Sequence, residues 1–388
     1  MKSKYKVLTS VIFILVFFPI EILGIPAFGR KYNMSCQTCH SPFPRLKDYG
    51  DEFAKNGFVL YDKDALRYFM ETGDEELNLI RDIPLAFRFD GFASFKNKDK
   101  ESKFEFGIPR VMKILSGGSL TKDIAYYFYF YLNEKGKIAG LEDAYFMFNN
   151  VFKSELDLYL GQFQVCDPLF KRETRLTLED YQIYTLKPGK SRINLGYDRG
   201  IMLNLPLPLK TDLTFMILNG SGIGQSENDN FDLDNINNFF GRISQDVFDF
   251  LRLGMAAYHG KEKFIDSISI SNKLLMYGGD LTFSVNDKLE LNYQFLRRTD
   301  SNPSASEENI KLNGSFLELI YTPKGDESKT YFAGLFNYIN SNNSKYNYQS
   351  IALNIGYLLR RNIRLIGEIQ YNVKAKATEF SIGFSSAY

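Results

Sequence analysis

The feature that most constrains the fold is an alternation of apolar and polar residues that begins near Pro84 and continues to the C-terminus. It is clearest in the segments 85–90, 127–132, 156–160, 289–294 and 363–371. Successive side chains of a β-strand point to opposite faces, so each segment predicts a strand with one apolar face. Alternating segments of about ten residues are typical of strands that cross a membrane, with polar side chains facing the lumen. A soluble β-sandwich gives the same alternation, so this pattern alone leaves both architectures open.

The lengths of the connections favour a barrel. We count about sixteen strands, which start near residues 84, 103, 123, 140, 155, 193, 211, 237, 249, 270, 287, 310, 329, 347, 362 and 376. Long connections are expected at 165–192, 220–236, 260–269 and 300–309, and short ones at 206–210, 246–248, 286–287 and 360–361. Long and short connections broadly alternate, as in barrels with long outer loops and short periplasmic turns. The prediction is therefore an all-β, antiparallel transmembrane barrel over residues 84–388.

Residues 1–24 have the pattern of a signal peptide. Three lysines precede the apolar run Val7–Ile20, and Gly24 is a small residue at a suitable cleavage position. An uncleaved membrane anchor is the alternative, although the run is short for a span of roughly 20 residues. Export would place the cysteines of the chain in an oxidising compartment.

A short motif, CQTCH at residues 36–40, follows the export signal. Cys-x-x-Cys-His is the attachment pattern of c-type haem, in which two thiols bond to the porphyrin and the histidine supplies a nitrogen to iron. A zinc site would need four ligands at characteristic spacing, and the chain has no second pair of cysteines or histidines to complete one. A structural disulfide is the other alternative. We predict one covalent haem c, held by Cys36, Cys39 and His40.

Residues 25–83 are expected to form a small α-helical haem module. Candidates for covering one face of the haem are Phe43, Leu46, Phe53, Phe58 and Leu60. The segment 62–82 has a partly helical pattern, and Met70 within it is the best candidate for a sixth iron ligand. Packing on a helix face is the alternative role of this methionine. A module this short buries little surface, so another part of the chain has to shield the haem.

The segment Ile25–Phe58, IPAFGRKYNMSCQTCHSPFPRLKDYGDEFAKNGF, resembles the N-terminal module of bacterial outer-membrane cytochrome–porin fusions. That family includes proteins implicated in iron(II) oxidation. Over residues 84–388 the resemblance is one of pattern only, to porins of the phosphate-selective type. It implies a sixteen-stranded barrel that holds one c-type haem in or beneath its pore. Ser35 is a departure, because iron-oxidising members tend to have proline before the first motif cysteine.

Together these features predict an electron-transfer protein of the bacterial outer membrane. Its haem would move single electrons between an extracellular donor, with iron(II) as a candidate, and periplasmic cytochromes or other carriers. Membrane lipid is the other expected partner, and an Fe(II)-oxidising enzyme activity is left open. The alternative function is a solute or anion-selective porin with a haem plug or gate. A formal net charge of +1 gives no reason to expect nucleic acid as a partner.

Three further features give weaker signals. His259 shares the parity of its apolar neighbours, which places it on the lipid face rather than at iron. Cys166 has no cysteine partner, and it opens the longest connection, which we expect to fold into the lumen. The loop 224–235 carries four carboxylates that suit a hard divalent cation, although a solvated loop is the plainer interpretation. These carboxylates belong to Glu227, Asp229, Asp232 and Asp234.

Overall fold

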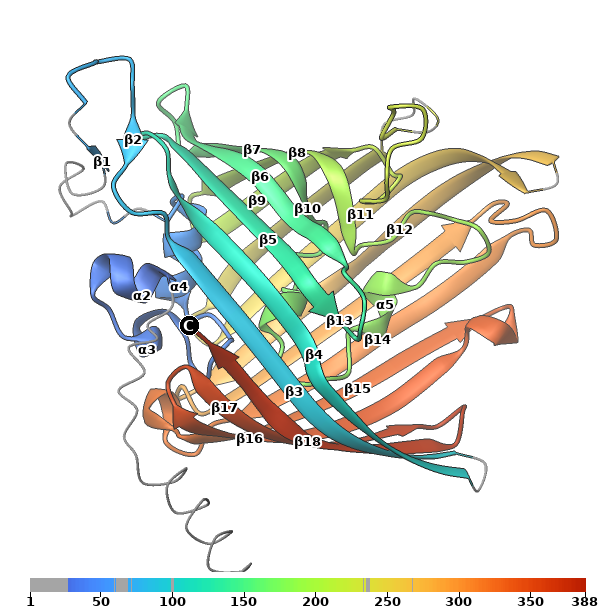
Figure 1. Cartoon of the computed structure of the whole chain (residues 1–388). Helices are drawn as coiled ribbons and strands as arrows, with labels where there is room; N and C mark the ends of the chain where they lie inside the picture. Colours follow the sequence, from blue (N-terminus) through green and yellow to red (C-terminus); the bar gives the residue numbers. More distant parts are fainter. Residues whose placement is uncertain are drawn as a thin grey trace, which may run out of the picture.

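The computed structural model describes residues 27–58, 60, 69–70, 72–98, 101–232, 234, 238–266 and 268–388. The expected signal peptide therefore lies outside the described residues. The described chain forms a closed β-barrel with a small helical module at one end, close to the C-terminus (Figure 1). None of the described helices is long and apolar enough to cross a membrane.

Sixteen antiparallel strands form the barrel, and pairing of β18 with β3 closes it. The strands are β3 Leu85–Lys98, β4 Glu101–Ser119, β5 Ile124–Glu134, β6 Gly140–Val151, β7 Leu156–Gln164, β8 Tyr197–Leu207, β9 Thr211–Leu218, β10 Asn238–Phe248, β11 Leu251–Asp266, β12 Ile268–Val285, β13 Leu289–Asp300, β14 Ile310–Tyr321, β15 Thr330–Ser341, β16 Tyr348–Arg360, β17 Ile363–Asn372 and β18 Ala377–Ala387. Each strand pairs with its neighbours in sequence. The predicted barrel, its number of strands and the approximate start of each strand are therefore confirmed.

The barrel wall is apolar outside, and its inner face carries polar side chains together with a buried apolar cluster. Along β13, the side chains of Asn292, Gln294 and Arg298 are buried, whereas those of Leu289 and Phe295 are exposed. Exposed apolar side chains on one face of a closed barrel are expected where that face contacts lipid. A single closed sheet with an apolar outer face excludes the two packed sheets of a soluble sandwich.

The longest connections lie at one end of the barrel and most of the short ones at the other, although β3 and β4, and β11 and β12, are also joined by short turns at the first end. Those at the end with the helical module, the short-turn end, include 208–210, 249–250, 286–288 and 361–362. Those at the other end, the long-loop end, include 165–196, 219–237 and 301–309. This distribution confirms the predicted alternation of connections.

The predicted long loop over residues 260–269 is wrong. Strands β11 and β12 continue through this segment as a paired hairpin, up to the pair Asp266 and Ile268. The charged residues Lys261, Glu262 and Lys263 are part of β11. An apolar outer face is needed only where a strand contacts lipid. A hairpin that extends beyond the lipid can therefore keep its backbone pairing without the apolar alternation on which the prediction depended.

The helical module consists of α2 Ala27–Tyr32, α3 Cys36–Cys39 and α4 Asp48–Lys55. Its buried core is formed by Phe53, Phe58 and Leu60. Phe28 stacks on Phe58 with ring centroids 4.8 Å apart, and Tyr127 of β5 stacks on the same ring at 5.5 Å. The module therefore shares its aromatic core with the barrel wall, which supplies the surface that so short a segment lacks.

The predicted helix over 62–82 is wrong in its described part, although its first residues lie outside the described chain. Here β1 (Phe69–Met70) pairs with β2 (Leu79–Ile80). Between them the Thr72 hydroxyl donates a hydrogen bond to a backbone carbonyl, and the Asp74 carboxylate accepts one from a backbone N–H. Such local side-chain bonds compete with the hydrogen bonds of a helix, which explains the difference.

Candidate functional site

The Cys-x-x-Cys-His motif lies in the module at the short-turn end of the barrel (Figure 1). Ser35 caps helix α3, because its hydroxyl accepts a hydrogen bond from the backbone N–H of Gln37 at 3.3 Å. The N–H of His40 then donates to the Cys36 carbonyl at 2.9 Å. One helical turn thus places both thiols and the imidazole in the same small segment. Cys36 and Cys39 are free thiols, and both are half-buried.

The imidazole of His40 is held by the backbone of the turn that follows it. Its Nδ1 lies 2.8 Å from the carbonyl oxygen of Pro44 and 3.3 Å from that of Arg45. A carbonyl only accepts, so Nδ1 carries the proton and Nε2 is left with a lone pair, the form in which histidine binds a metal. Burial lowers the pKa of His40, which favours this neutral form. The ring of Phe43 packs edge-on against it, with centroids 5.1 Å apart.

The two thiols are in a less polar setting than free cysteine. Burial raises the pKa of both, and the neighbouring Cys36 adds to the effect on Cys39. In the described residues no group of three or more His, Cys, Asp or Glu side chains is arranged to hold a metal ion. In this structure the two cysteines of the motif form no disulfide. Among the described residues, the motif also belongs to no metal centre built from protein side chains alone.

A narrow cleft borders the motif. Cys36, His40 and Phe43 line one side, and Asp326 and Arg361 from the short-turn end of the wall line the other. Its volume is about 10 Å³, roughly the space of one water molecule. The donor set, two thiols and an imidazole with Nε2 available, fits a covalent haem c. The cleft is too small to enclose a porphyrin.

Polar contacts fasten the module to the short-turn end of the barrel. Lys47 forms an ion pair with Asp326, which lies between β14 and β15. Gln37 donates a hydrogen bond to the backbone carbonyl of the same aspartate at 2.5 Å. Arg45 forms an ion pair with Glu290 at the start of β13. The loop that carries the motif is therefore fixed to the wall on both sides of His40.

The structure does not bring the candidate sixth ligand to the motif. Met70 lies in β1 with 52% of its surface exposed, and it does not line the cleft beside His40. His259 is exposed on the outer face of β11, as its parity predicted. Of the apolar residues expected to cover a haem face, Phe43 contacts His40, whereas Phe53, Phe58 and Leu60 pack in the module core. Iron ligation by Met70 stays a prediction, and it requires the β1–β2 hairpin to move.

The substitution Met70→Ala tests that ligation. If Met70 binds the iron once haem is attached, its loss should convert a low-spin ferric spectrum to a high-spin one, because thioether is a strong axial ligand. Absorption spectroscopy of the purified protein in detergent measures the change. Met34→Ala is the matched control, since Met34 packs on the module core. An unchanged low-spin spectrum in Met70→Ala would exclude this ligand.

The connection 165–196 folds into the barrel, as predicted, and we call it the lumenal loop. It contains the short helices η2 (Arg172–Thr174) and α5 (Gln182–Thr185). Its buried apolar side chains include those of Leu169, Leu176, Tyr181 and Ile183. Cys166 is fully buried at its start, with Sγ 3.8 Å from Oε1 of Gln164. The lumen is thus partly filled by the chain itself.

Hydrogen bonds hold the lumenal loop at roughly opposite sides of the wall. Glu173 forms an ion pair with Lys113 of β4 at 2.8 Å. The Tyr184 hydroxyl donates to Oε1 of Gln294 on β13 at 2.9 Å. Strands β14 to β18 and β3 lie between these two attachment points in the strand order. The loop therefore crosses the lumen rather than following one wall.

A third attachment point is the carboxylate of Glu368 on β17. It accepts hydrogen bonds from the backbone N–H groups of Leu178 at 2.6 Å and Glu179 at 3.0 Å. The Glu179 carboxylate in turn accepts from the hydroxyls of Tyr348 at 2.7 Å and Ser350 at 2.9 Å. The alternation along β17 indicates that Glu368 faces the lumen, but it does not identify the partners of this carboxylate. The attachment of the lumenal loop to Glu368 was therefore not predicted.

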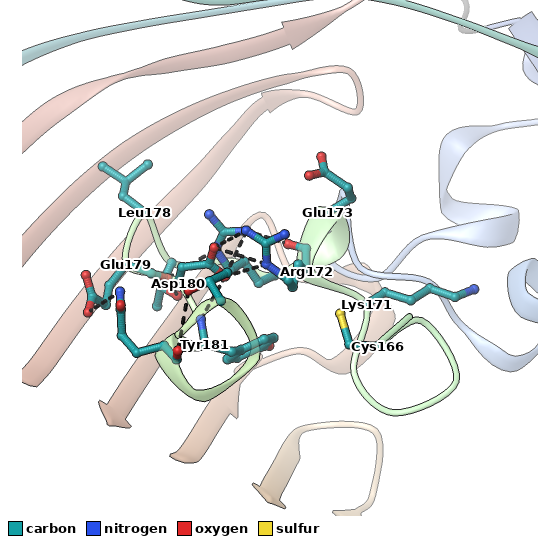
Figure 2. Close-up of polar contacts among 12 residues, drawn as sticks. Cys166, Lys171, Arg172, Glu173, Leu178, Glu179, Asp180 and Tyr181 are labelled. Carbon is teal, nitrogen blue, oxygen red and sulfur yellow. Dashed lines mark hydrogen bonds and ion pairs between the residues drawn. The ribbon is translucent and has the colours of Figure 1, made fainter. Parts of the chain in front are cut away.

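The lumenal loop also reaches the helical module. Lys171 extends away from the other polar residues of the loop and pairs with Asp51 of α4 at 2.8 Å (Figure 2). Within the loop, Arg172 forms an ion pair with Asp180 (Figure 2). The module and the loop are thus joined to each other as well as to the wall.

A cavity of about 560 Å³, which we call the vestibule, lies between the lumenal loop and the long-loop end of the wall. The loop contributes Arg172, Glu179 and Asp180 to its lining, and the wall contributes residues of β4, β6, β17 and β18. Its lining is mainly charged. The sequence patterns did not identify the residues that line the vestibule, because these residues come from strands far apart in the chain.

In its described part, the acidic loop 224–235 does not form the alternative cation site. The Asp234 carboxylate accepts a hydrogen bond from the backbone N–H of Lys263 at 2.6 Å and pairs with Arg192 at 3.3 Å. Glu227 and Asp229 are exposed to solvent. The plainer interpretation, a solvated loop, describes these residues better, because Asp234 serves to connect the loop to the wall.

Comparison with known proteins adds evidence on the fold. No known protein-family profile matches the chain, and no curated protein matches it. An anion-selective porin from Comamonas acidovorans matches in structure with a TM-score of 0.57 and 13% identity, covering 79% of this chain and 99% of the porin. OprB from Pseudomonas putida matches with a TM-score of 0.59 and 11% identity, covering 79% of this chain and 94% of OprB. The channel DcaP of Acinetobacter baumannii matches with a TM-score of 0.56 and 12% identity, covering 79% of this chain and 97% of DcaP.

At these identities the likeness concerns the fold, which is that of outer-membrane porins. This fold places the chain in the bacterial outer membrane. In such barrels the short turns face the periplasm and the long loops face the outside. The helical module with its Cys-x-x-Cys-His motif accordingly lies at the periplasmic mouth, and the vestibule opens toward the cell exterior.

Proposed function

We propose that this outer-membrane protein transfers single electrons by way of one haem c bound to Cys36, Cys39 and His40. One observation carries the proposal. His40 follows two free thiols, and its Nδ1–H is engaged by the Pro44 carbonyl, so that Nε2 is available to iron. This backbone bond is the outer contact that metal-binding histidines commonly make.

The bound haem would supply a one-electron couple, and the chain would supply position and insulation. Cys36 and Cys39 would hold the haem covalently, and His40 would ligate its iron. The ion pairs of Lys47 and Arg45 keep the motif at the periplasmic mouth, where periplasmic cytochromes or other carriers could exchange electrons with it. The proposed donor is extracellular, with iron(II) as the first candidate.

Mixing the ferric protein with iron(II) in a stopped-flow spectrophotometer tests the donor. We expect the spectrum of reduced haem to appear, because outer-sphere transfer needs only access and a suitable potential. Dithionite serves as the positive control. Reduction by dithionite but not by iron(II) would remove iron(II) as the donor. A haem that neither reagent reduces would contradict the electron-transfer function itself.

The alternative function is a solute or anion-selective channel in which the module acts as a plug. The fold comparisons by themselves favour this alternative, because the structural neighbours are porins and one is described as anion-selective. The vestibule of about 560 Å³ would be its outer entrance. Conductance across a planar lipid bilayer separates the two functions. Stepwise anion current together with a redox-silent haem would support the channel.

A further inference from the structure

Cationic side chains lie on both sides of the contact between the helical module and the short-turn end of the wall. Lys47 and Arg45, which belong to the module, form ion pairs with Asp326 and Glu290 of the wall. These ion pairs account for the positions of both module side chains. Two arginines that the wall contributes to the same region differ, because neither forms an ion pair with an acidic side chain of the described residues.

The first of them, Arg361, lies in the turn between β16 and β17 and is partly buried. It lines the narrow cleft that Cys36 and His40 border from the module side. It is the one arginine or lysine among the residues that line this cleft. A guanidinium stays charged at all physiological pH values, so the wall places a permanent positive charge beside the motif.

The second arginine, Arg364, lies near the start of β17 and is only 3% exposed. Its Nη1 donates hydrogen bonds to the Tyr331 hydroxyl at 3.0 Å and to the carbonyl oxygen of Phe43 at 3.3 Å. Phe43 is the residue whose ring packs against His40. Nε of Arg364 is buried and has no hydrogen-bond partner in the described structure. A buried guanidinium with neutral partners and an unused donor is costly, which indicates that an anionic group completes the site.

The chemistry of that group follows from the shape of a guanidinium. Its planar fork of N–H donors matches the two oxygens of a carboxylate. A haem carries two such groups, its propionate side chains, in addition to its iron. The two arginines lie beside the motif that would hold the haem, one lining its cleft and one bonded to Phe43. A soluble anion such as inorganic phosphate offers similar oxygen atoms, so the experiment has to separate these two sources.

We propose that Arg361 and Arg364 bind the propionate carboxylates of the haem. This inference rests on the proposed function, because it requires a haem held by the motif. The haem would then be bonded to the module by its thioethers and to the barrel by its carboxylates. The barrel would thus complete a haem site for which so short a module has too little surface.

Resonance Raman spectroscopy of the full-length haem protein in detergent tests the contact, since the propionate bending band moves when the carboxylate loses a hydrogen bond. We expect Arg361→Gln and Arg364→Gln each to move this band. Each should also lower the reduction potential of the haem, because a carboxylate without its cationic partner leaves more negative charge beside the iron and stabilises the ferric state.

The matched control is Arg360→Gln, which removes the same charge from the neighbouring position. Arg360 is exposed, and its Nη1 donates to the backbone carbonyl of Leu359 at 3.1 Å. The band and the potential should both stay as in the unmodified protein. A band that stays in place in Arg361→Gln and Arg364→Gln would overturn the assignment. So would equal changes in Arg360→Gln, which would show a diffuse effect of charge. Should Arg364→Gln fail to fold, the comparison of Arg361→Gln with Arg360→Gln decides.

Titration of the haem protein with inorganic phosphate, followed by calorimetry, separates the two sources of the anion. We expect no saturable binding that depends on the arginines, because the propionates already occupy them. Saturable phosphate binding that Arg364→Gln abolishes, with an unmoved propionate band, would make a soluble anion the ligand and contradict the proposal. Failure of the proposed function looks different, because the unmodified protein would then carry no covalent haem. Covalent haem with an unmoved band refutes only the role of the arginines.

Discussion

Replacing both Cys36 and Cys39 with alanine is expected to abolish covalently attached haem. The third cysteine, Cys166, is fully buried in the lumenal loop, and thioether attachment needs accessible thiols beside the ligating histidine. A peroxidase-activity stain of a denaturing gel measures the result, after expression in a host that attaches c-type haem. The stain should fall from a clear band to background.

Cys166→Ala is the matched control and should retain the stained band. The barrel should form in both variants, because the module cysteines lie outside its wall. Heat-dependent migration on a gel reports this, since closed barrels have no free edges and resist detergent. A stained band in the double variant, or none in the unmodified protein, would contradict haem attachment at this motif.

The second large effect is expected from Glu368→Ala, which should open the lumen. Its carboxylate accepts hydrogen bonds from two backbone N–H groups of the lumenal loop, and leaving each one buried without a partner costs about 1–3 kcal/mol. We expect the freed loop to move, so that a protein without stepwise current in a planar bilayer begins to show it. Trypsin should also cleave at Arg172 and Arg175, which the attached loop protects.

Glu379→Ala is the control for this experiment. It removes a carboxylate from the same cavity, but its ion pair with Lys96 is half-exposed, and such pairs contribute at most about 1 kcal/mol. Conductance and cleavage should stay as in the unmodified protein. Open-porin current from the unmodified protein would show that the lumenal loop does not close the channel, and it would favour the porin alternative over electron transfer.

The barrel could be predicted because its signal is local. Apolar residues such as Leu289 and Phe295 face outward on β13 and alternate with buried Asn292 and Gln294, and this pattern needs no knowledge of distant residues. The prediction of secondary structure failed in segments that do not contact lipid, where strands need no apolar outer face. The hairpin around Asp266 extends through the charged residues 261–263 of β11, and the segment near Met70 forms side-chain bonds in place of a helix.

The candidate haem site could also be predicted from the sequence only in part. Attachment chemistry depends on residues that are neighbours in sequence, so the order Cys36, Cys39 and His40 is enough to suggest it. The orientation of the imidazole depends on the Pro44 carbonyl, and the position of the module depends on Asp326 and Glu290. Those partners lie in turns and strands that no spacing rule connects to the motif.

Local sequence patterns predict the class of barrel, the approximate start of its strands, the face on which His259 lies and the motif that could attach a haem. Each follows from period-two alternation or from spacing over a few residues. Three other features depend on the folded barrel: the lumenal loop crosses it, Glu368 and Asp51 hold this loop, and a bulge brings Glu142 and Asp143 to one face. Those features require strands far apart in the chain to meet, and closure of the barrel is what brings them together.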